Sequence, residues 1–307
     1  MRVMLTGGAG MLGRSLTEAW HAQRPEDELR VVTRQDVDLR DREATRSLVA
    51  EIRPDAVVHA AARVGGIAAK LAAPLDYLRD NLLLDQSLIG AAIELGVPEL
   101  LYVGSAAVYP ERCDRPFVET DVLSGPMEPA NEGYAIAKLA GGKLCEYASR
   151  QHGLAYRVVV PSNLYGEHDH FGSGGAHMIA AALTKVHRAK QSGAATVEIW
   201  GDGTARREFT WAGDVAAWLV GQVGRLESWP ALLNLGVGVD HSVSEYYAAA
   251  REAVGWTGEF VHDLDKPSGT PRRLLDSSAA RALGWDPRTS LADGMATAYR
   301  KLLSQLD

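Results

Sequence analysis

The chain begins with a short apolar run that leads directly into three regularly spaced glycines. Residues 2–6 read as a β-strand, Gly7, Gly10 and Gly13 follow, and a helical stretch starts at Arg14. Glycines at this spacing permit a tight turn, a close approach of the backbone to a pyrophosphate, and close packing of helix on sheet. The amino terminus of the helix then faces the phosphates, because its free N–H groups attract anions. This opening unit predicts a dinucleotide-binding α/β fold rather than a plain loop between two elements.

The same alternation of strand and helix continues through the first half of the chain. Apolar runs at residues 29–33, 55–60, 100–104 and 155–160 predict further strands, and residues 73–95 predict a long helix. Such alternation is typical of a parallel sheet that is covered by helices on both faces. Ligands of these sheets bind outside the carboxyl ends of the strands. We therefore expect an α/β fold with a doubly wound parallel sheet of the Rossmann type.

The pattern changes after residue 166, where glycines and the histidines His168, His170 and His177 precede a helix. Residues 233–236 again resemble a strand of the main sheet, so we expect a second, smaller α/β lobe that binds the substrate and is woven from two segments. The expected division is residues 1–165 plus about 207–240 for the dinucleotide-binding domain, and about 166–206 plus 241–307 for the lobe.

The residues that follow the second strand bear on which dinucleotide is bound. In folds of this type an acidic residue at the tip of that strand grips the ribose 2′-hydroxyl of NAD. Here the strand runs into Thr33-Arg34-Gln35 without an acid, and an arginine suits a 2′-phosphate. This favours NADP(H) over NAD(H), unless Arg34 is merely solvated. Asp38 and Leu39 stand where such folds often contact adenine.

Tyr134 and Lys138 are four residues apart on a predicted helix and therefore share one face. An ammonium beside a phenol lowers the pKa of the phenol, because a nearby positive charge favours the phenolate. A phenol tuned in this way exchanges a proton with the substrate when a carbonyl is reduced or an alcohol is oxidised. The alternative is an amphipathic helix with an unrelated tyrosine and lysine.

Composition argues against several other classes of protein. The formal charge of −7 argues against binding to nucleic acids or anionic membranes. No apolar run approaches the roughly 20 residues that span a bilayer, and Cys113 and Cys145 form no zinc pattern. So few cysteines fit a reducing compartment, and the chain enters a strand at once instead of a signal peptide. We expect a cytoplasmic enzyme without a membrane, nucleic-acid or metal partner.

Several further motifs occur in the order and at the spacing of one enzyme family. They are Arg63-Val-Gly-Gly-Ile67, Gly104-Ser105 with Val108-Tyr-Pro110, Glu128-Pro with Asn131-Glu132, Tyr134-Ala-Ile-Ala-Lys138, Pro161-Ser-Asn-Leu-Tyr-Gly166, Arg207-Glu-Phe209, and Gly269-Thr-Pro-Arg272 with Leu274-Leu-Asp276. With these motifs, which span nearly the whole chain, the sequence resembles the GDP-L-fucose synthases, which are extended short-chain dehydrogenase/reductases.

The resemblance implies an NADPH-dependent enzyme that epimerises GDP-4-keto-6-deoxy-D-mannose at C3 and C5 and then reduces C4. It implies that Tyr134 donates a proton to the C4 oxygen, that Lys138 lowers the pKa of this phenol and holds the nicotinamide ribose, and that Ser105 hydrogen-bonds the keto oxygen. His177 matches the acid of the epimerisation. The resemblance also implies a homodimer, in which the 73–95 helix and the helix carrying Tyr134 form a four-helix interface between two subunits.

The resemblance extends to the remaining binding residues. The cofactor is expected to contact Gly7, Gly10, Met11, Leu12, Arg34, Asp38, Leu39, Ala61, Lys138, Pro161, Asn163, Leu164 and His177. The GDP-linked substrate is expected to contact Asn163, Lys185, Trp200, Arg207 and Arg273. Lys185 stands where the family often has an arginine, so the charge is kept while the bidentate contact with phosphate is lost.

One position departs from the family in a way that affects the chemistry. Two residues after the catalytic serine the family has a cysteine, which acts as a base in epimerisation, and this chain has Ala107. A methyl group cannot remove a proton from C3 or C5, and a positioned base typically contributes ~10²–10⁴-fold. Three interpretations stay open: a reductase without epimerase activity, another base such as His168, His170 or Cys113, or a substrate that arrives epimerised or is a related sugar such as a heptose. In each of them hydride transfer is retained.

Two other functions compete with this one. A 4-epimerase of the same superfamily would keep NAD bound and be redox-neutral overall, and a dinucleotide-binding regulatory protein would bind the cofactor without catalysis. The complete set of Ser105, Tyr134 and Lys138 argues against the regulatory protein. A dehydratase usually needs a pair of carboxylates close to the serine, and Ser105-Ala-Ala lacks it.

Overall fold

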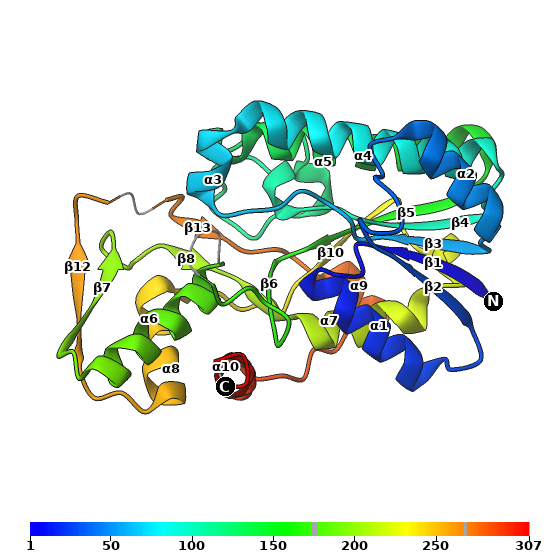
Figure 1. Cartoon of the computed structure of the whole chain (residues 1–307). Helices are drawn as coiled ribbons and strands as arrows, with labels where there is room; N and C mark the ends of the chain where they lie inside the picture. The colour runs from blue at the N-terminus through cyan, green and yellow to red at the C-terminus, as the bar shows by residue number, and fades with distance from the viewer. Residues whose placement is uncertain (173–176, 267–268, 307) are drawn as a thin grey trace.

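A six-stranded parallel sheet forms the centre of the molecule (Figure 1), in a computed structural model that describes residues 1–172, 177–266 and 269–306. The strands in the order of the sheet are β10 (Leu232–Leu235), β5 (Ala155–Pro161), β4 (Glu99–Val103), β3 (Ala56–His59), β1 (Arg2–Thr6) and β2 (Glu28–Val32). β1 pairs with β2 on one side and β3 on the other, so Thr6 stands beside both Val32 and His59. The order of the strands reverses between β1 and β3, and the carboxyl ends of these two strands flank the crevice in which such sheets bind ligands.

Helices cover both faces of this sheet (Figure 1). One face carries α2 (Arg42–Ile52), α4 (Pro74–Glu94) and α5 (Glu132–His152), and the other carries α1 (Met11–Gln23), α7 (Ala212–Gln222) and the short α9 (Ser278–Ala282). Leu88 and Cys145 are buried in the first layer, and Leu16 and Leu219 in the second. Each large apolar side chain contributes about 1.5–3 kcal/mol when fully buried. The two layers therefore hold the carboxyl edge of the sheet in place.

A smaller lobe lies to one side of the sheet (Figure 1). Its helices α6 (Met178–Ser192), α8 (Val243–Val254) and α10 (Leu291–Leu303) share a buried cluster with the parallel pair β7 (Thr196–Trp200) and β12 (Glu259–Asp263). Three short strands form a second small sheet, in which β8 (Arg206–Arg207) lies between β11 (His241–Ser242) and β13 (Arg272–Arg273). β6 (Asn163–Tyr165) pairs with β9 (Phe209–Trp211). These short pairings connect the lobe to the carboxyl edge of the main sheet.

The remaining elements are short and lie in the connections of the first half, apart from one near β10. They are α3 (Ile67–Ala72) and the 3₁₀ helices η1 (Ala106–Val108), η2 (Glu119–Asp121), η3 (Pro129–Asn131) and η4 (Leu226–Ser228). None of the residues of α3 is buried, so this helix is positioned by contacts of single side chains rather than by an apolar face.

The parallel α/β sheet expected from the sequence is confirmed, with strand ends within about one residue of the expected ones. Helix α8 begins with a capping box, in which the Ser242 hydroxyl accepts from the Glu245 N–H at 3.1 Å and the Glu245 carboxylate accepts from the Ser242 N–H at 2.6 Å. The expected division into two parts stays a prediction. Ala280 and Trp285, which it assigns to the lobe, pack with the helix layer of α1 and α7. No helix in the described ranges is long and apolar enough to cross a membrane.

Candidate active site

The glycine turn after β1 has the close packing that its spacing predicts. Gly7 adopts a positive φ of 78°, and a Cβ there would stand 2.6 Å from the backbone nitrogen of Ala61 at the end of β3. A Cβ at Gly13 would overlap the carbonyl oxygen of Gly7. Gly10 is the N-cap of α1 and offers no side chain, so the first N–H groups of the helix stay open for an anion. The turn is thus shaped as a cradle for a pyrophosphate.

The turn after β2 exposes an arginine at the position expected for the 2′-phosphate. Arg34 is exposed, and the acid closest in sequence, Asp36, accepts hydrogen bonds from the N–H and hydroxyl of Thr33 at 2.8 and 2.9 Å. Asp38 pairs with Arg40 at 2.8 Å, and these hydrogen bonds lower the pKa of Asp38 to about 2. Both acids are therefore already bound by neighbours on their own loop.

The other residues expected at the cofactor follow the carboxyl ends of the strands. Leu39 is packed in the core of the sheet, whereas Asp38 beside it is exposed. Met11 and Leu12 begin α1, and Ala61 follows β3. Pro161 ends β5, and Asn163 and Leu164 belong to β6. His177 is the N-cap of α6.

Tyr134 lies in the first turn of α5 and Ser105 follows β4, so two elements bring their hydroxyls to one place. The Ser105 hydroxyl accepts from the N–H of Ala107 at 3.2 Å, which holds it at the head of η1. Tyr134 is buried, and burial raises the pKa of its phenol to about 12, while the Ser105 hydroxyl acts to lower it and Asp85 to raise it. The phenol is therefore protonated at neutral pH, as a proton donor must be.

The position of Lys138 differs from the sequence expectation. Its ammonium lies 4.2 Å from the centre of the Tyr102 ring rather than against Tyr134. Burial lowers the pKa of Lys138, and Asp85 opposes this change. Burial raises the pKa of the Tyr134 phenol more than the neighbouring Ser105 hydroxyl lowers it. The lowered pKa that the helix spacing predicts for this phenol is therefore not found.

A buried network beneath Lys138 was not foreseen from the sequence. It consists of Thr6, His59, Asp85 and Tyr102, together with Lys138 itself. The Thr6 hydroxyl lies 2.8 Å from Nδ1 of His59, whose Nε2 lies 3.1 Å from the Asp85 carboxylate. That carboxylate also accepts a short hydrogen bond from the Tyr102 hydroxyl. Burial lowers the pKa of His59, which favours its neutral form. The negative charge of the Asp85 carboxylate therefore balances the positive charge of Lys138. Two features of the sequence could have indicated this network: His59 ends an apolar strand, and Asp85 lies in a long helix among apolar residues.

His177 is oriented by an acid that sequence reasoning also missed. It is the N-cap residue of α6, and its Nδ1 lies 3.1 Å from Oδ1 of Asp169. Asp169 is buried, and its second oxygen has no hydrogen-bond partner among the described residues. The neighbouring His168 turns instead toward α1, where its ring lies 2.8 Å from the carboxylate of Glu18. The structure thus pairs His177 with an acid and gives His168 a contact on α1.

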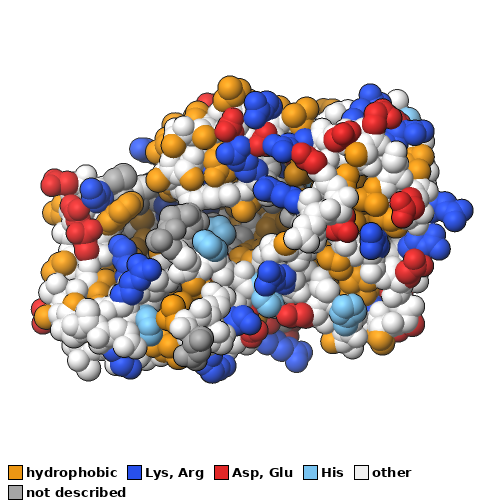
Figure 2. Space-filling model, in the orientation of Figure 1, with side chains coloured by type: hydrophobic (Ala, Val, Ile, Leu, Met, Phe, Trp, Pro, Cys, Tyr) orange, Lys and Arg blue, Asp and Glu red, His pale blue; other side chains and the backbone are white. Residues whose placement is uncertain are grey.

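Three of the residues expected to bind the substrate donate hydrogen bonds to backbone carbonyls. Figure 2 shows one face of the molecule hollowed below the layer of α3, α4 and α5, with Lys and Arg side chains around the hollow. The guanidinium of Arg273 is buried and donates to the carbonyl of Ala106 at 2.8 Å, so it holds η1. Arg207 donates to the carbonyl of Thr270 at 2.6 Å. Asn163 donates to the carbonyl of Glu208 at 3.2 Å.

Lys185 and Trp200 meet farther out on the lobe. The ammonium of Lys185 lies 5.5 Å from the centre of the Trp200 ring, and that of Lys266 lies 5.9 Å from the same ring. Trp200 is 53% exposed, so an apolar ring with two cations beside it faces the solvent. A flat ring that carries phosphates would find both stacking and charge here.

Comparison with known proteins agrees with this geometry. Residues 3–229 match the NAD dependent epimerase/dehydratase family. The chain is 40% identical over 299 residues to a GDP-L-fucose synthase of Azorhizobium caulinodans, covering 97% of this chain and 95% of that protein. A solved GDP-6-OMe-4-keto-L-xylo-heptose reductase from C. jejuni superposes with a TM-score of 0.91 at 28% identity, over 99% of this chain and 97% of that one. A GDP-mannoheptose C4 reductase from Campylobacter jejuni with NADP bound gives a TM-score of 0.89 at 27% identity, over 98% of both chains.

Proposed function

Since the chain belongs to the NAD dependent epimerase/dehydratase family, with GDP-L-fucose synthases as relatives over nearly its full length, we propose that it reduces C4 of a GDP-4-keto-6-deoxy sugar with NADPH. The observation that carries the proposal is the pair of hydroxyls from Ser105 and Tyr134 at the carboxyl edge of the sheet, beside a glycine cradle. The chain is an NADP-dependent sugar-nucleotide oxidoreductase. A redox-neutral 4-epimerase and a non-catalytic regulator are not favoured, because the relatives that are 40% identical over nearly the full length are named as GDP-L-fucose synthases, whereas the solved UDP-glucose 4-epimerases that match are 22–25% identical.

The residues around the cradle fit NADP(H). The open N–H groups at the start of α1 face the pyrophosphate, and Gly7 and Gly13 leave room for it. The exposed Arg34 is placed to bind the 2′-phosphate. NADPH supplies the hydride that the reaction needs. Lys138 is placed to approach the nicotinamide ribose from below, where Asp85 keeps its charge balanced.

The reaction at C4 needs a proton for the oxygen that receives negative charge. Ser105 donates a hydrogen bond to that oxygen, and the protonated phenol of Tyr134 delivers the proton. The raised pKa of this phenol suits donation to an alkoxide, which is a stronger base than the phenolate. The Ala107 N–H holds the Ser105 hydroxyl, and the phenol of Tyr134 is buried next to it, so little reorganisation accompanies the step.

Substrate binding is assigned to the lobe. We assign the diphosphate to Arg207 and Arg273, because guanidinium groups suit phosphates, and the guanine ring to the exposed Trp200 with Lys185 beside it. His177, at the N-cap of α6, would contact the sugar and the cofactor. A GDP-linked 4-keto-heptose is the second candidate substrate, because the two solved neighbours are named as reductases of GDP-heptoses.

The direct test is incubation of the purified protein with NADPH and GDP-4-keto-6-deoxymannose. We expect NADPH to be consumed and a GDP-6-deoxyhexose to form, with NADH oxidised at a lower rate. The same assay with a UDP- or dTDP-linked 4-keto sugar is the control for the nucleotide. Consumption of NADPH only with the control sugars would contradict the GDP assignment, and a tightly held nicotinamide that never turns over would point to a 4-epimerase.

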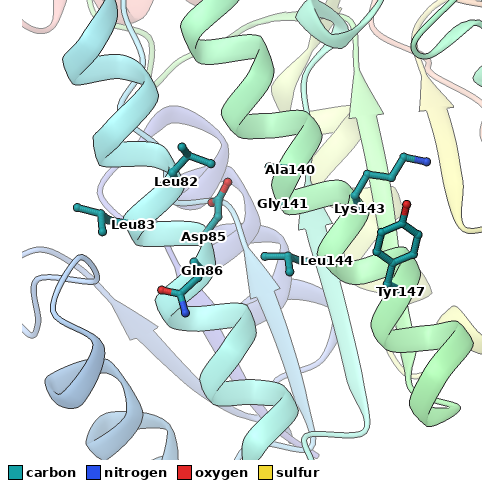
Figure 3. A pocket seen from close by; sticks show the side chains of 9 residues that line it. All are labelled: Leu82, Leu83, Asp85, Gln86, Ala140, Gly141, Lys143, Leu144 and Tyr147. Carbon is teal, nitrogen blue, oxygen red and sulfur yellow. The ribbon is translucent and has the colours of Figure 1, made fainter.

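We also propose that the protein is a homodimer. A groove of about 470 Å³ runs between α4 and α5 on their outer side (Figure 3), lined by Leu83, Leu144 and Tyr147 among others. These three side chains are 42%, 37% and 51% exposed. Pairing of the two helices with those of a second copy would cover this apolar surface. In analytical ultracentrifugation Leu144→Glu is expected to convert the dimer into a monomer, and a wild-type monomer would contradict the proposal.

The cytoplasmic location expected from the sequence is likewise part of this proposal. This location is supported by the two cysteines, Cys113 and Cys145, which are both free thiols, as is usual in a reducing compartment.

A further inference from the structure

A second lysine lies against Tyr134. Lys70 belongs to the short helix α3, and its amine stands 4.4 Å from the centre of the Tyr134 ring. The amine donates to Oδ1 of Asn131 at 2.8 Å, at the end of η3, directly before the helix that carries Tyr134. Because α3 buries none of its residues, the place of Lys70 is set by these two contacts. Nothing in the motifs of the sequence singled it out.

The charges around Lys70 come from several elements that meet at the opening of the site. Asn131 donates to the carboxylate of Glu128 at 2.5 Å, and this carboxylate acts on Lys70, Arg207 and Arg273 alike. Arg273 in turn holds the carbonyl beside Ala107. The amine of Lys70 therefore lies against the ring of Tyr134, and Arg273, which is affected by the same carboxylate, holds η1, the short helix that contains Ala107.

The amine is available as a base near neutral pH. Burial lowers the pKa of Lys70 to about 8, and Glu128 opposes this change. Roughly a quarter of such amines is unprotonated at pH 7.5. By contrast, the cation of an exposed lysine keeps its proton until about pH 10. Ala107 offers no proton acceptor, so a base at this side of the sugar has to come from elsewhere.

We infer that Lys70 is a further catalytic residue, whose amine removes a proton from the carbon next to the C4 carbonyl of the bound sugar. This inference rests on the proposed function, because it needs a 4-keto sugar whose carbonyl oxygen is held by Ser105 and Tyr134. It assigns to Lys70 the proton transfer that the methyl group of Ala107 cannot perform.

The step balances without a further reactant. The C–H bond at C3 or C5 breaks, its proton moves to Nζ of Lys70, and the amine becomes an ammonium. The electron pair enters the ring as an enolate, and the negative charge on the C4 oxygen is stabilised by the Ser105 and Tyr134 hydroxyls. Return of a proton to the same face restores the sugar, and return from the opposite face, where an imidazolium such as that of His177 can act, inverts the carbon.

The other bases that the sequence left open have weaker geometry. His168 is held by Glu18 on α1, and Cys113 is half-buried against the core beneath its loop. His170 is exposed, with its N–H bound to the neighbouring Asp169 carboxylate. None of these three has a recorded contact with Tyr134 or Ser105 among the described residues, whereas Lys70 has one.

The test measures deuterium from D₂O at the carbons next to the keto group. The protein is incubated with GDP-4-keto-6-deoxymannose and NADP⁺, which assembles the site without a hydride, and the recovered sugar is analysed by NMR. We expect the wild type to exchange C3 or C5 hydrogen above the background without enzyme. Lys70→Arg keeps the charge and the contact with Asn131 but cannot act as a base, so we expect exchange to fall ~10²-fold or more.

Controls separate chemistry from structure. Lys70→Gln should behave as Lys70→Arg does, and reduction of C4 by NADPH should change less than about tenfold in both variants. Lys190→Gln, which loses a lysine tether to the carbonyl of Val254 in the lobe, should leave exchange unchanged. Wild-type exchange no faster than background, or full exchange in Lys70→Arg, would overturn the inference. Absence of NADPH consumption by the wild type would instead overturn the proposed reduction, whatever the exchange shows.

Discussion

The two sides of the active site are built in different ways. The buried network of Thr6, His59, Asp85, Tyr102 and Lys138 lies within the main sheet and its helix layer, and all its members are buried. The cleft cluster of Lys70, Glu128, Asn131, Arg207 and Arg273 comes from short elements, and all but Arg273 are only half-buried. The hydrogen bonds of the buried network join its own members. In the cleft cluster, by contrast, Arg207 and Arg273 donate to backbone carbonyls, and the cluster contains one carboxylate.

The two sides serve different parts of the proposed reaction. The hydroxyls and the ammonium that serve C4 come from the carboxyl end of β4 and from α5, which belong to the main sheet and its helix layer. The groups that we assign to the neighbouring carbons sit on α3, η1 and η3; α3 and η3 bury none of their residues, whereas η1 buries Ala106 and Val108. The departure at Ala107 and the amine of Lys70 both fall on this second side. We therefore expect substitutions in the network to affect reduction and stability, and substitutions in the cleft cluster to affect proton exchange.

The largest effect is expected for Tyr134→Phe. Loss of the phenolic proton should lower kcat for C4 reduction by ~10²–10⁴-fold, with the affinity for NADPH nearly unchanged because the cradle of Gly7 and Gly13 is untouched. Stopped-flow measurement of NADPH oxidation with fluorescence titration of the cofactor checks both parts. Tyr147→Phe on the outer side of α5 is the matched control. Wild-type kcat in Tyr134→Phe would mean that another group protonates the C4 oxygen.

The second prediction concerns the network itself. Asp85→Asn keeps a hydrogen-bonding group for His59 and Tyr102 but removes the charge that faces Lys138. Breaking a buried pair in this way typically costs about 3–5 kcal/mol, so the thermal midpoint should fall by roughly 10 °C. Asp85 raises the pKa of Lys138 against the effect of burial, so its removal lowers that pKa further. The ammonium is then lost at a lower pH, and the alkaline limb of kcat should move to lower pH.

A matched change on the same helix sharpens this prediction. Asp76→Asn removes an acid whose side chain is 41% exposed and which pairs with Arg63 at 3.3 Å. Exposed pairs contribute about 0–1 kcal/mol, so the thermal midpoint and the pH profile should stay close to those of the wild type. Equal destabilisation by the two substitutions would remove the distinction between a buried network and its surroundings.

The sequence predicted the groups that serve C4, but not the buried network that lies beneath Lys138. The strand–turn–helix unit, Ser105, and the pair of Tyr134 and Lys138 follow from local spacing, because a parallel sheet places every strand end at one edge. The contact of Lys138 with Tyr102 did not follow, since i to i+4 spacing describes one helix and not the strand beneath it. Asp85 and His59 are 26 residues apart in the chain, and a single sequence does not reveal such a pairing.

Two further groups of the site, Lys70 and Asp169, were missed for a physical reason. Lys70 lies in a helix of six residues with no buried face, so no periodicity distinguishes it from a solvated lysine. Asp169 likewise shows its role only when the fold brings it to His177, eight residues along the chain. Arg273 was expected to bind substrate, and the structure shows a guanidinium that holds η1 through the Ala106 carbonyl. Its contact with substrate stays a prediction.

The smallest effect is expected for Glu128→Gln, and it tests whether the cleft cluster acts as a unit. In the wild type, deuterium exchange should rise with pH toward a plateau above about 8, because Lys70 accepts a proton only as the neutral amine. The Glu128 carboxylate raises the pKa of Lys70. Its removal therefore lowers that pKa, and the midpoint of the exchange profile should move to lower pH by less than one unit.

The consequence at neutral pH is a gain, which separates this variant from one that merely damages the site. Below the plateau a lower pKa increases the fraction of neutral amine, so exchange at pH 7 should rise by a few fold while the plateau stays or falls. The amide oxygen introduced by Glu128→Gln would still accept the hydrogen bond from Asn131, so the tether of Lys70 is kept. Glu132→Gln, which changes an exposed acid at the start of α5, should leave the profile in place. An unmoved midpoint in Glu128→Gln would show that exchange is not governed by Lys70, and the base would then have to be sought outside the cleft cluster.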